Sequence, residues 1–176
     1  ADLSQALQDT ALALRQTVAN IWGQTKPYQI AKAQPVVGLN INVAALTDMD
    51  FAAPTRLDGD WSFDGATDVF TCTCVPDHVD LKVNIKVSIA NGSSVQRPVQ
   101  VVEIVRISDG KIMASAATGY IRDASDHEEA SYNFSVVDES PGVNPAYKIT
   151  YIKEGSNSGV VTIDDTKSSF SLTAWQ

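Results

Sequence analysis

Hydrophobic residues recur along this chain with two different periods, and the change between them falls near residue 35. In the first part, apolar residues are spaced alternately by three and four, which is typical of a helix with one apolar stripe. The stripe consists of Ser4, Leu7, Ala11, Leu14, Val18 and Ile21. Asp2 can cap the start, and Gly23 with Pro27 ends the pattern, so we expect a helix over residues 2 to 22.

An isolated helix of this length is marginally stable in water, so its stripe must pack on something. The sequence leaves three alternatives open: its own domain, sister copies of the chain, or another protein. Residues 23–35 show neither period and carry two prolines, which predicts a connector. We therefore divide the chain into residues 1–35, for oligomerisation or docking, and a domain over residues 36–176.

From Val36 onward, apolar and polar residues alternate with period two, which predicts strands. The clearest are residues 39–43, 79–89 and 99–107; further candidates are 69–75, 111–118, 132–137, 147–153, 159–163 and 170–175. Turn residues separate most of them at the spacing of an all-β sandwich. Eight or nine antiparallel strands after one helix predict a two-sheet β-sandwich, and a jelly roll is among the expected arrangements.

Composition narrows the functional classes. A length of 176 residues suits one domain with an appendage. With 13 basic and 21 acidic residues, the formal charge of −8 would repel a phosphate backbone, so we expect no nucleic-acid partner. Because no window approaches the ~20 apolar residues that cross a bilayer, we expect no membrane partner.

The sequence offers few residues suited to catalysis. Only two histidines are present, His78 and His127, and both lie in polar, turn-like contexts typical of solvated loops. The chain contains no phosphate-binding glycine loop and no nucleophile elbow. We therefore expect no enzyme and no cofactor.

Three places in the sequence could contribute metal ligands. Cys72 and Cys74 would point the same way in an extended strand, too far apart for an easy disulfide, so we expect two buried reduced thiols rather than a metal site. The acidic segments 58–68 and 123–129 suggest calcium, but the first lacks the glycine and closing glutamate of a calcium loop. The second is most simply a solvated loop, so no metal site is predicted.

Trp61 lies in a polar stretch and has two interpretations. An exposed tryptophan often anchors an interface, whereas a buried one covers a core. We include Trp61 with Leu7, Ala11, Leu14, Val18 and Ile21 as candidate interface residues. The aromatic residues are otherwise spread along the chain rather than clustered as a stacking platform.

The C-terminal half resembles a known pattern. Residues 97–111, Gly119-Tyr-Ile-Arg, the segment 132–142 with its Asp-Glu-Ser-Pro-Gly loop, Ala146-Tyr-Lys-Ile and Phe170-Ser-Leu-Thr-Ala together resemble the TNF-like jelly roll of bacteriophage virion proteins. That family includes capsid decoration (cement) proteins and the tips of fibres or spikes. The resemblance covers residues 36–176 and does not extend to residues 1–35.

The resemblance implies a non-enzymatic homotrimer whose inner strands meet along a three-fold axis, located on the capsid surface of a virion. Its expected partner is the major capsid protein of the shell, with the helix either bundling in the trimer or gripping the shell. A receptor- or glycan-binding fibre tip is the alternative. We favour the decoration protein because fibre proteins usually carry a long shaft, and only one short helix precedes this domain.

Overall fold

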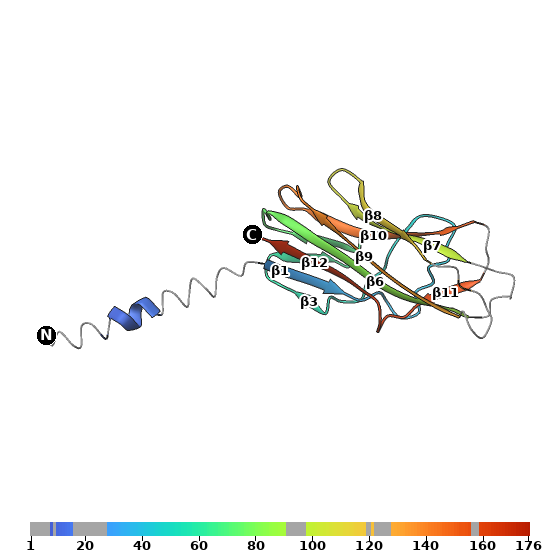
Figure 1. Cartoon of the computed structure of the whole chain (residues 1–176), viewed down its shortest axis with the longest axis horizontal. Helices are drawn as coiled ribbons and strands as arrows, with labels where there is room; N and C mark the ends of the chain where they lie inside the picture. The colour runs from blue at the N-terminus through green and yellow to red at the C-terminus, as the bar shows by residue number, and fades with distance from the viewer. Residues whose placement is uncertain are drawn as a thin grey trace.

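The computed structural model describes residues 8, 10–15, 28–90, 98–118, 121, 128–155 and 159–176. Residues 8 and 10–15 are helical and lie apart from a β-sandwich (Figure 1). This agrees with the predicted helix, whose other residues lie outside the described ones. Among the described residues, no helix has the length and apolar character needed to cross a membrane.

The first sheet is built around the longest strand, β6. One edge of β6 pairs with β9, and the other edge pairs with β12 and then with β11. Beyond β12 lie β1 and β3, and every pairing is antiparallel. The strands are β1 (Tyr28–Ala33), β3 (Arg56–Leu57), β6 (His78–Ala90), β9 (Glu129–Asp138), β11 (Val160–Ile163) and β12 (Ser169–Trp175).

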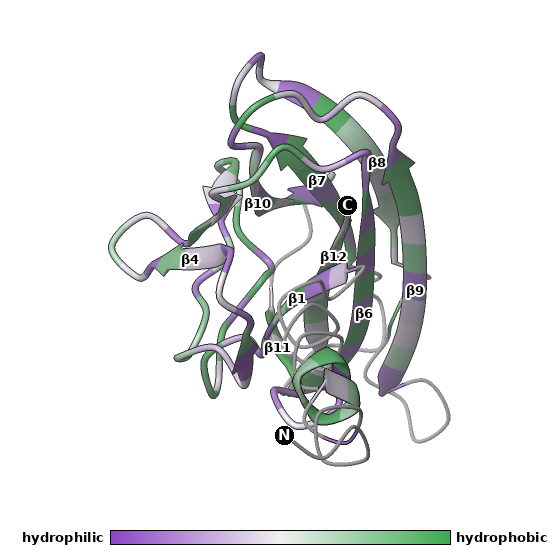
Figure 2. Ribbon diagram, turned by 90° about the vertical axis from the view of Figure 1, so that its left-hand side faces the viewer, coloured by the Kyte–Doolittle hydropathy of each residue, from purple (hydrophilic) through white to green (hydrophobic). Residues whose placement is uncertain are grey.

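The second sheet has the order β4-β5-β10-β7-β8, and the short strand β2 also pairs with β10. Its strands are β2 (Thr47–Asp48), β4 (Trp61–Asp64), β5 (Val69–Cys72), β7 (Val99–Arg106), β8 (Lys111–Ala117) and β10 (Ala146–Glu154). The two antiparallel sheets face each other as a jelly-roll sandwich, which confirms the predicted fold class. Seen from the end at which β1 begins, β4 lies on one side of the sandwich and β8 and β9 on the other (Figure 2).

The core lies between the sheets because alternate residues of each long strand point inward. Along β6, every second side chain from Val79 to Ile89 is buried. Three phenylalanines join the sheets near the middle: the ring centroids of Phe51 and Phe70 are 5.7 Å apart, and those of Phe70 and Phe170 are 5.5 Å apart. Edge-to-face contacts of this kind add to the free energy gained by burying the rings.

The prediction of a connector over residues 23–35 was wrong for residues 28–33, which form β1 and pair with β12 along its whole length. The inward side chains of β1 are Ala31 and Ala33. Alanine gives little strand signal, so this strand depends on its partners rather than on its own pattern. The sandwich therefore begins at Tyr28 rather than at Val36.

The strand expected at residues 39–43 is also absent, although Ile41 is fully buried. The side chain of Asn40 accepts hydrogen bonds from the backbone N–H groups of Asn42, at 3.0 Å, and Val161, at 3.1 Å. A side chain that occupies backbone donors in this way competes with a strand ladder. An isolated bridge joins Asn40 to Thr162, and the backbone N–H of Ile41 donates to the backbone oxygen of Val161 at 2.9 Å.

Candidate interaction surfaces

The helical stripe is described only in part. Ala11 and Leu14 lie on the described helical turn, and Leu14 is 64% exposed. Leu12, which the stripe does not include, is 67% exposed. The other stripe residues, Ser4, Leu7, Val18 and Ile21, lie outside the described residues. An interface role for this stripe stays a prediction.

Trp61 is part of the core and not of an exposed loop. It begins β4, its side chain is 4% exposed, and its indole N–H donates a hydrogen bond of 3.1 Å to the backbone oxygen of Gln29. The interpretation of Trp61 as an exposed anchor was therefore wrong, because so little of its surface remains for a partner. The indole instead joins β4 of the second sheet to β1 of the first.

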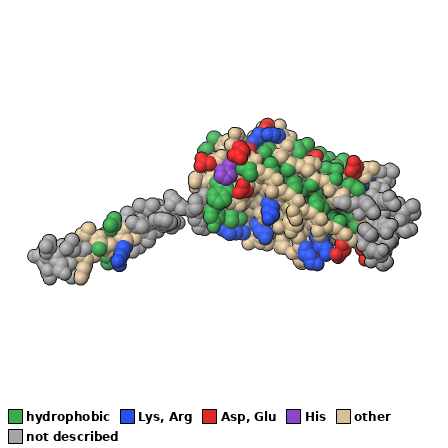
Figure 3. All heavy atoms as spheres, in the orientation of Figure 1, with side chains coloured by type: hydrophobic (Ala, Val, Ile, Leu, Met, Phe, Trp, Pro, Cys, Tyr) green, Lys and Arg blue, Asp and Glu red, His purple; other side chains and the backbone are tan. Residues whose placement is uncertain are grey.

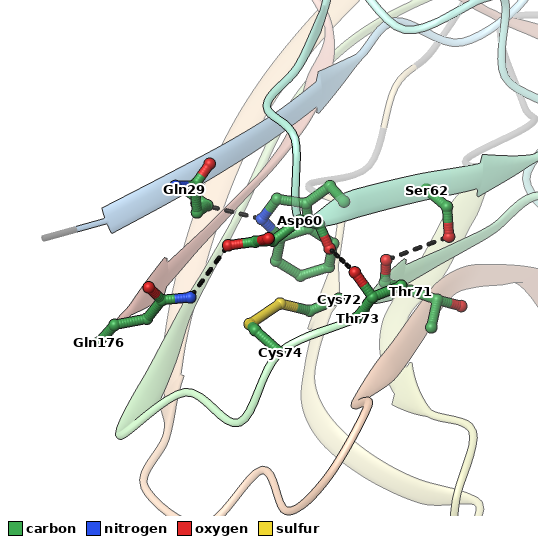
Figure 4. The surroundings of a disulfide bond; sticks show 9 residues. Gln29, Asp60, Ser62, Thr71, Cys72, Thr73, Cys74 and Gln176 are labelled. Carbon is green, nitrogen blue, oxygen red and sulfur yellow. Dashed lines mark hydrogen bonds between the residues drawn. A yellow bond between two sulfur atoms is a disulfide. The ribbon is translucent and has the colours of Figure 1, made fainter. Parts of the chain in front are cut away.

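Cys72 and Cys74 form a disulfide, so the prediction of two reduced thiols was wrong. β5 ends at Cys72 and the chain bends there, which brings the two Cα atoms to 5.4 Å, within the range of a disulfide. Thr73 fixes this bend: its backbone N–H lies 2.7 Å and its hydroxyl 3.1 Å from the backbone oxygen of Asp60 (Figure 4). The sequence argument failed because it assumed an extended strand.

Neither the histidines nor the acidic segment 58–68 forms a chemical site in the described residues. His78 is not a loop residue, since it begins β6 and stacks on Trp175 with ring centroids 5.7 Å apart. His127 and most of segment 123–129 lie outside the described residues. In the part of the chain that the structure describes, no three His, Cys, Asp or Glu side chains gather as metal ligands.

The carboxylates of segment 58–68 hold separate pieces of backbone. Asp58 accepts a hydrogen bond from Ile30 N–H, Asp64 from Ala66 N–H and Asp68 from Phe51 N–H. Burial raises the pKa of Asp68, whereas the backbone hydrogen bond from Ala66 lowers the pKa of Asp64. These aspartates hold the backbone at three different places, and their carboxylates do not converge on one ion.

The side of the sandwich between β8 and β9 is only half covered, and we call it the open side. In the described ladders, β8 pairs only with β7 and β9 only with β6, so each has one free edge, and the two strands lie next to each other (Figure 2). Their inward apolar side chains are partly exposed although they touch the core: Met113, Ala114, Ala130, Tyr132, Phe134 and Val136. Unpaired edges above a half-covered core are typical of association sites.

Tyr132 on the open side has a buried hydroxyl with no hydrogen-bond partner. Burial raises the pKa of this phenol, so it stays neutral. A buried hydroxyl without a partner costs free energy, and such atoms are uncommon in folded proteins. The open side therefore leaves apolar side chains partly exposed and one buried hydroxyl without a hydrogen-bond partner.

The outward face of the first sheet carries an aromatic row that the sequence did not suggest. Tyr28, Trp175 and His78 are register partners on β1, β12 and β6, and the Tyr28 and Trp175 ring centroids are 5.4 Å apart. They come from three distant segments, so no local pattern indicates them. The stacked His78 ring covers one face of the indole, which leaves that face unavailable to a sugar.

Two hollows lie on the outward faces of the sheets. The hollow on the first sheet, of about 340 Å³, is lined by polar side chains only: Lys32, Lys82, Asn84, Asn133, Ser169 and Ser171. The groove on the second sheet, of about 600 Å³, has an apolar rim that includes Leu46, Ile107 and Ile112. An ion pair crosses this groove, with Lys148 Nζ 2.7 Å from a carboxylate oxygen of Asp48.

A charged network ties the two sheets together near the start of β1. Arg106 of the second sheet lies 2.9 Å from a carboxylate oxygen of Asp138 at the end of β9, and Tyr147 donates to the same carboxylate at 2.8 Å. Hydrogen bonds from Arg106 also lower the pKa of Asp109 to about 2. Asp138 is 3% exposed and fully paired, so this network is a structural clamp.

Comparisons with known proteins define the class by fold alone: the chain is a TNF-like jelly roll. Two crystal structures of murine APRIL, at pH 8.0 and at pH 5.0, superpose with TM-scores of 0.51 and 0.52. Sequence identity is 7% and 8%, and each match covers 84% of this chain and 98% of the other. No protein-family model and no curated protein sequence matches the chain.

Proposed function

We propose that this chain is a non-enzymatic virion protein that forms a homotrimer and decorates the outer surface of a phage head. In this role it binds the major capsid protein and stabilises the shell. Support comes from the resemblance of residues 36–176 to virion jelly rolls and from the TNF-like fold. The APRIL structures support the fold and say nothing about a phage.

The observation that carries self-association is the open side. A neighbouring copy packed there would cover the half-exposed side chains of β8 and β9 and shield both free edges. Closed symmetric association is the common outcome when identical chains share such a surface. In a trimer, the three N-terminal helices could either pack together as a bundle or each bind the shell.

The experiment has two parts. Light scattering on the purified full chain should give a mass near three times 18.9 kDa. Particles from which the protein has been omitted should then lose their DNA at a lower temperature than complete particles, and adding the purified chain should restore the higher temperature. A monomeric mass, or equal heat resistance with and without the chain, would contradict the proposal.

A receptor- or glycan-binding fibre tip is the second candidate, and the groove on the second sheet favours it. An apolar groove with a few polar groups is the usual form of a small-ligand site. Binding of a glycan or cell surface with micromolar affinity, lost in Ile112→Asp, would favour the tip over the decoration protein.

A further inference from the structure

One end of the sandwich gathers exposed apolar loops next to the start of β1, and we call it the terminal end. Tyr28 pairs with Trp175, and the backbone N–H of Asp77 donates to the backbone oxygen of Trp175 at 2.7 Å. The backbone N–H of Asn144 donates to the backbone oxygen of Cys74 at 3.2 Å. Segments far apart in sequence thus meet at this end of the sandwich (Figure 1).

Apolar side chains on this surface are unusually exposed. Val75 is 67%, Val143 71% and Tyr28 37% exposed, although all three lie beside ordered strands or loops. Trp175 lies next to Tyr28, with ring centroids 5.4 Å apart, and is held by the stacked His78 ring and by its own N–H, which donates to Asp80 at 2.8 Å. A fixed aromatic side chain loses little conformational entropy on contact, which makes it a good anchor for a partner.

Carboxylates surround this apolar centre. Asp77 and Glu139 are exposed beside it, and Figure 3 shows acidic side chains around the histidine at this end. Asp80 bonds to the Trp175 N–H, and Asp60 accepts from the side-chain amide of Gln176 at 3.0 Å. Because these donors are neutral, the negative charge remains available for a basic partner.

We infer that the terminal end is the surface that sits on the shell, and that it fits a protein patch with an apolar centre and a rim of lysine and arginine. This inference rests on the proposed function and specifies which end of the sandwich faces the capsid. The described helix lies beyond the same end (Figure 1). A helix and a surface that engage one partner together raise each other's effective concentration, so weak contacts at each suffice.

The test uses the full chain and particles that lack it. We expect Val75→Asp with Val143→Asp to weaken binding to these particles by roughly tenfold or more. The added carboxylates would be buried in the apolar centre of the contact. Asp77→Lys, a second exposed change, should weaken binding several-fold. Val37→Asp is the matched control: Val37 is 82% exposed and follows the far end of β1. It should bind as the unaltered chain does.

The experiment distinguishes failure of the proposed function from failure of this inference. If the unaltered chain fails to bind particles, the proposed function is wrong and this inference falls with it. If it binds and the Val75/Val143 variant binds equally well, only the inference is overturned. A variant whose solution mass changes would instead assign the terminal end to contacts between copies, which also overturns it; light scattering on each variant decides this.

Discussion

The two long sides of the sandwich are built in different ways. On the side of β1, β3 and β4, which we call the closed side, the Trp61 indole of the second sheet donates to Gln29 of the first. Asp58, which follows β3, extends the pairing with β1 inside the first sheet, because it accepts from Ile30 through its side chain and donates to it through its backbone. On the open side, Arg106 and Tyr147 of the second sheet bond to Asp138 at the end of β9, but among the described residues no such bond joins β8 to β9, and Tyr132 keeps an unpaired hydroxyl. The chain covers one side with its own strands, whereas β8 and β9 each keep one unpaired edge in the described ladders.

The largest expected effect is on the closed side. Trp61→Ala removes a buried indole and its hydrogen bond, and should lower the free energy of unfolding by about 3–5 kcal/mol. Denaturant unfolding followed by circular dichroism measures this. Trp61→Phe is the control that keeps a ring but loses the N–H donor, and should cost about 1–2 kcal/mol. A loss for Trp61→Ala below that of the control would contradict the account of the closed side.

The second prediction concerns the open side. Ala116 on β8 pairs with the buried Val102, so its side chain is on the inward face of the sheet. It is half-buried and lies at the open side. Ala116→Glu would place a charge in the contact between copies and should cost about 3 kcal/mol of association free energy. Light scattering should then give a single chain. Ala66→Glu, in the exposed turn after β4, should keep the trimeric mass; equal behaviour of both variants would remove the open side as an interface.

The disulfide should matter less than Trp61, although it lies near it. A bridge between residues two apart closes a very small loop, so its removal should lower stability by about 1–2 kcal/mol. Unfolding of Cys72→Ala with Cys74→Ala, against the unaltered chain with and without a reducing agent, measures this. A fold lost on reduction alone would show that the bridge, and not Trp61, holds this part of the closed side.

The smallest expected effect concerns the buried hydroxyl of Tyr132 on the open side. In a single copy, Tyr132→Phe removes a buried hydroxyl without a partner and should be neutral or stabilising by at most about 1 kcal/mol. Because a single copy already buries this hydroxyl, a neighbouring copy cannot reach it, and the change should leave association unaltered. Unfolding at low and at high protein concentration should show the same small effect, and a loss of stability at high concentration alone would contradict this.

Sequence patterns predicted the strands that carry strong alternation and missed those that depend on their neighbours. β6 and β12 alternate between apolar and polar residues, so their inward faces can be read directly, whereas in β7 the polar Gln100 is buried and Val101 is on the outward face. β1 buries two alanines, and β4 was hidden in an acidic stretch. Both form because partners elsewhere in the chain pair with them.

The interaction surfaces were harder to predict for the same reason. The open side and the aromatic row are made by residues that meet only after the sheets have formed, and Tyr28, His78 and Trp175 each look ordinary in their own segment. Exposure also decides what a residue can do, and the sequence does not give it. Trp61 shows this, because its polar stretch left both an exposed and a buried position open, and the structure buries it.

The position of β1 has a mechanical consequence. β1 lies between β12 and β3, and six register pairs join it to β12, starting at Tyr28 where the N-terminal segment enters the sheet. A load applied to the tail along the strand would pull β1 lengthwise past its neighbours, so the hydrogen bonds of the ladder would share the force and would have to fail together. A load on the N-terminal segment would thus act on β1 in shear, the direction in which a β-sheet is strongest.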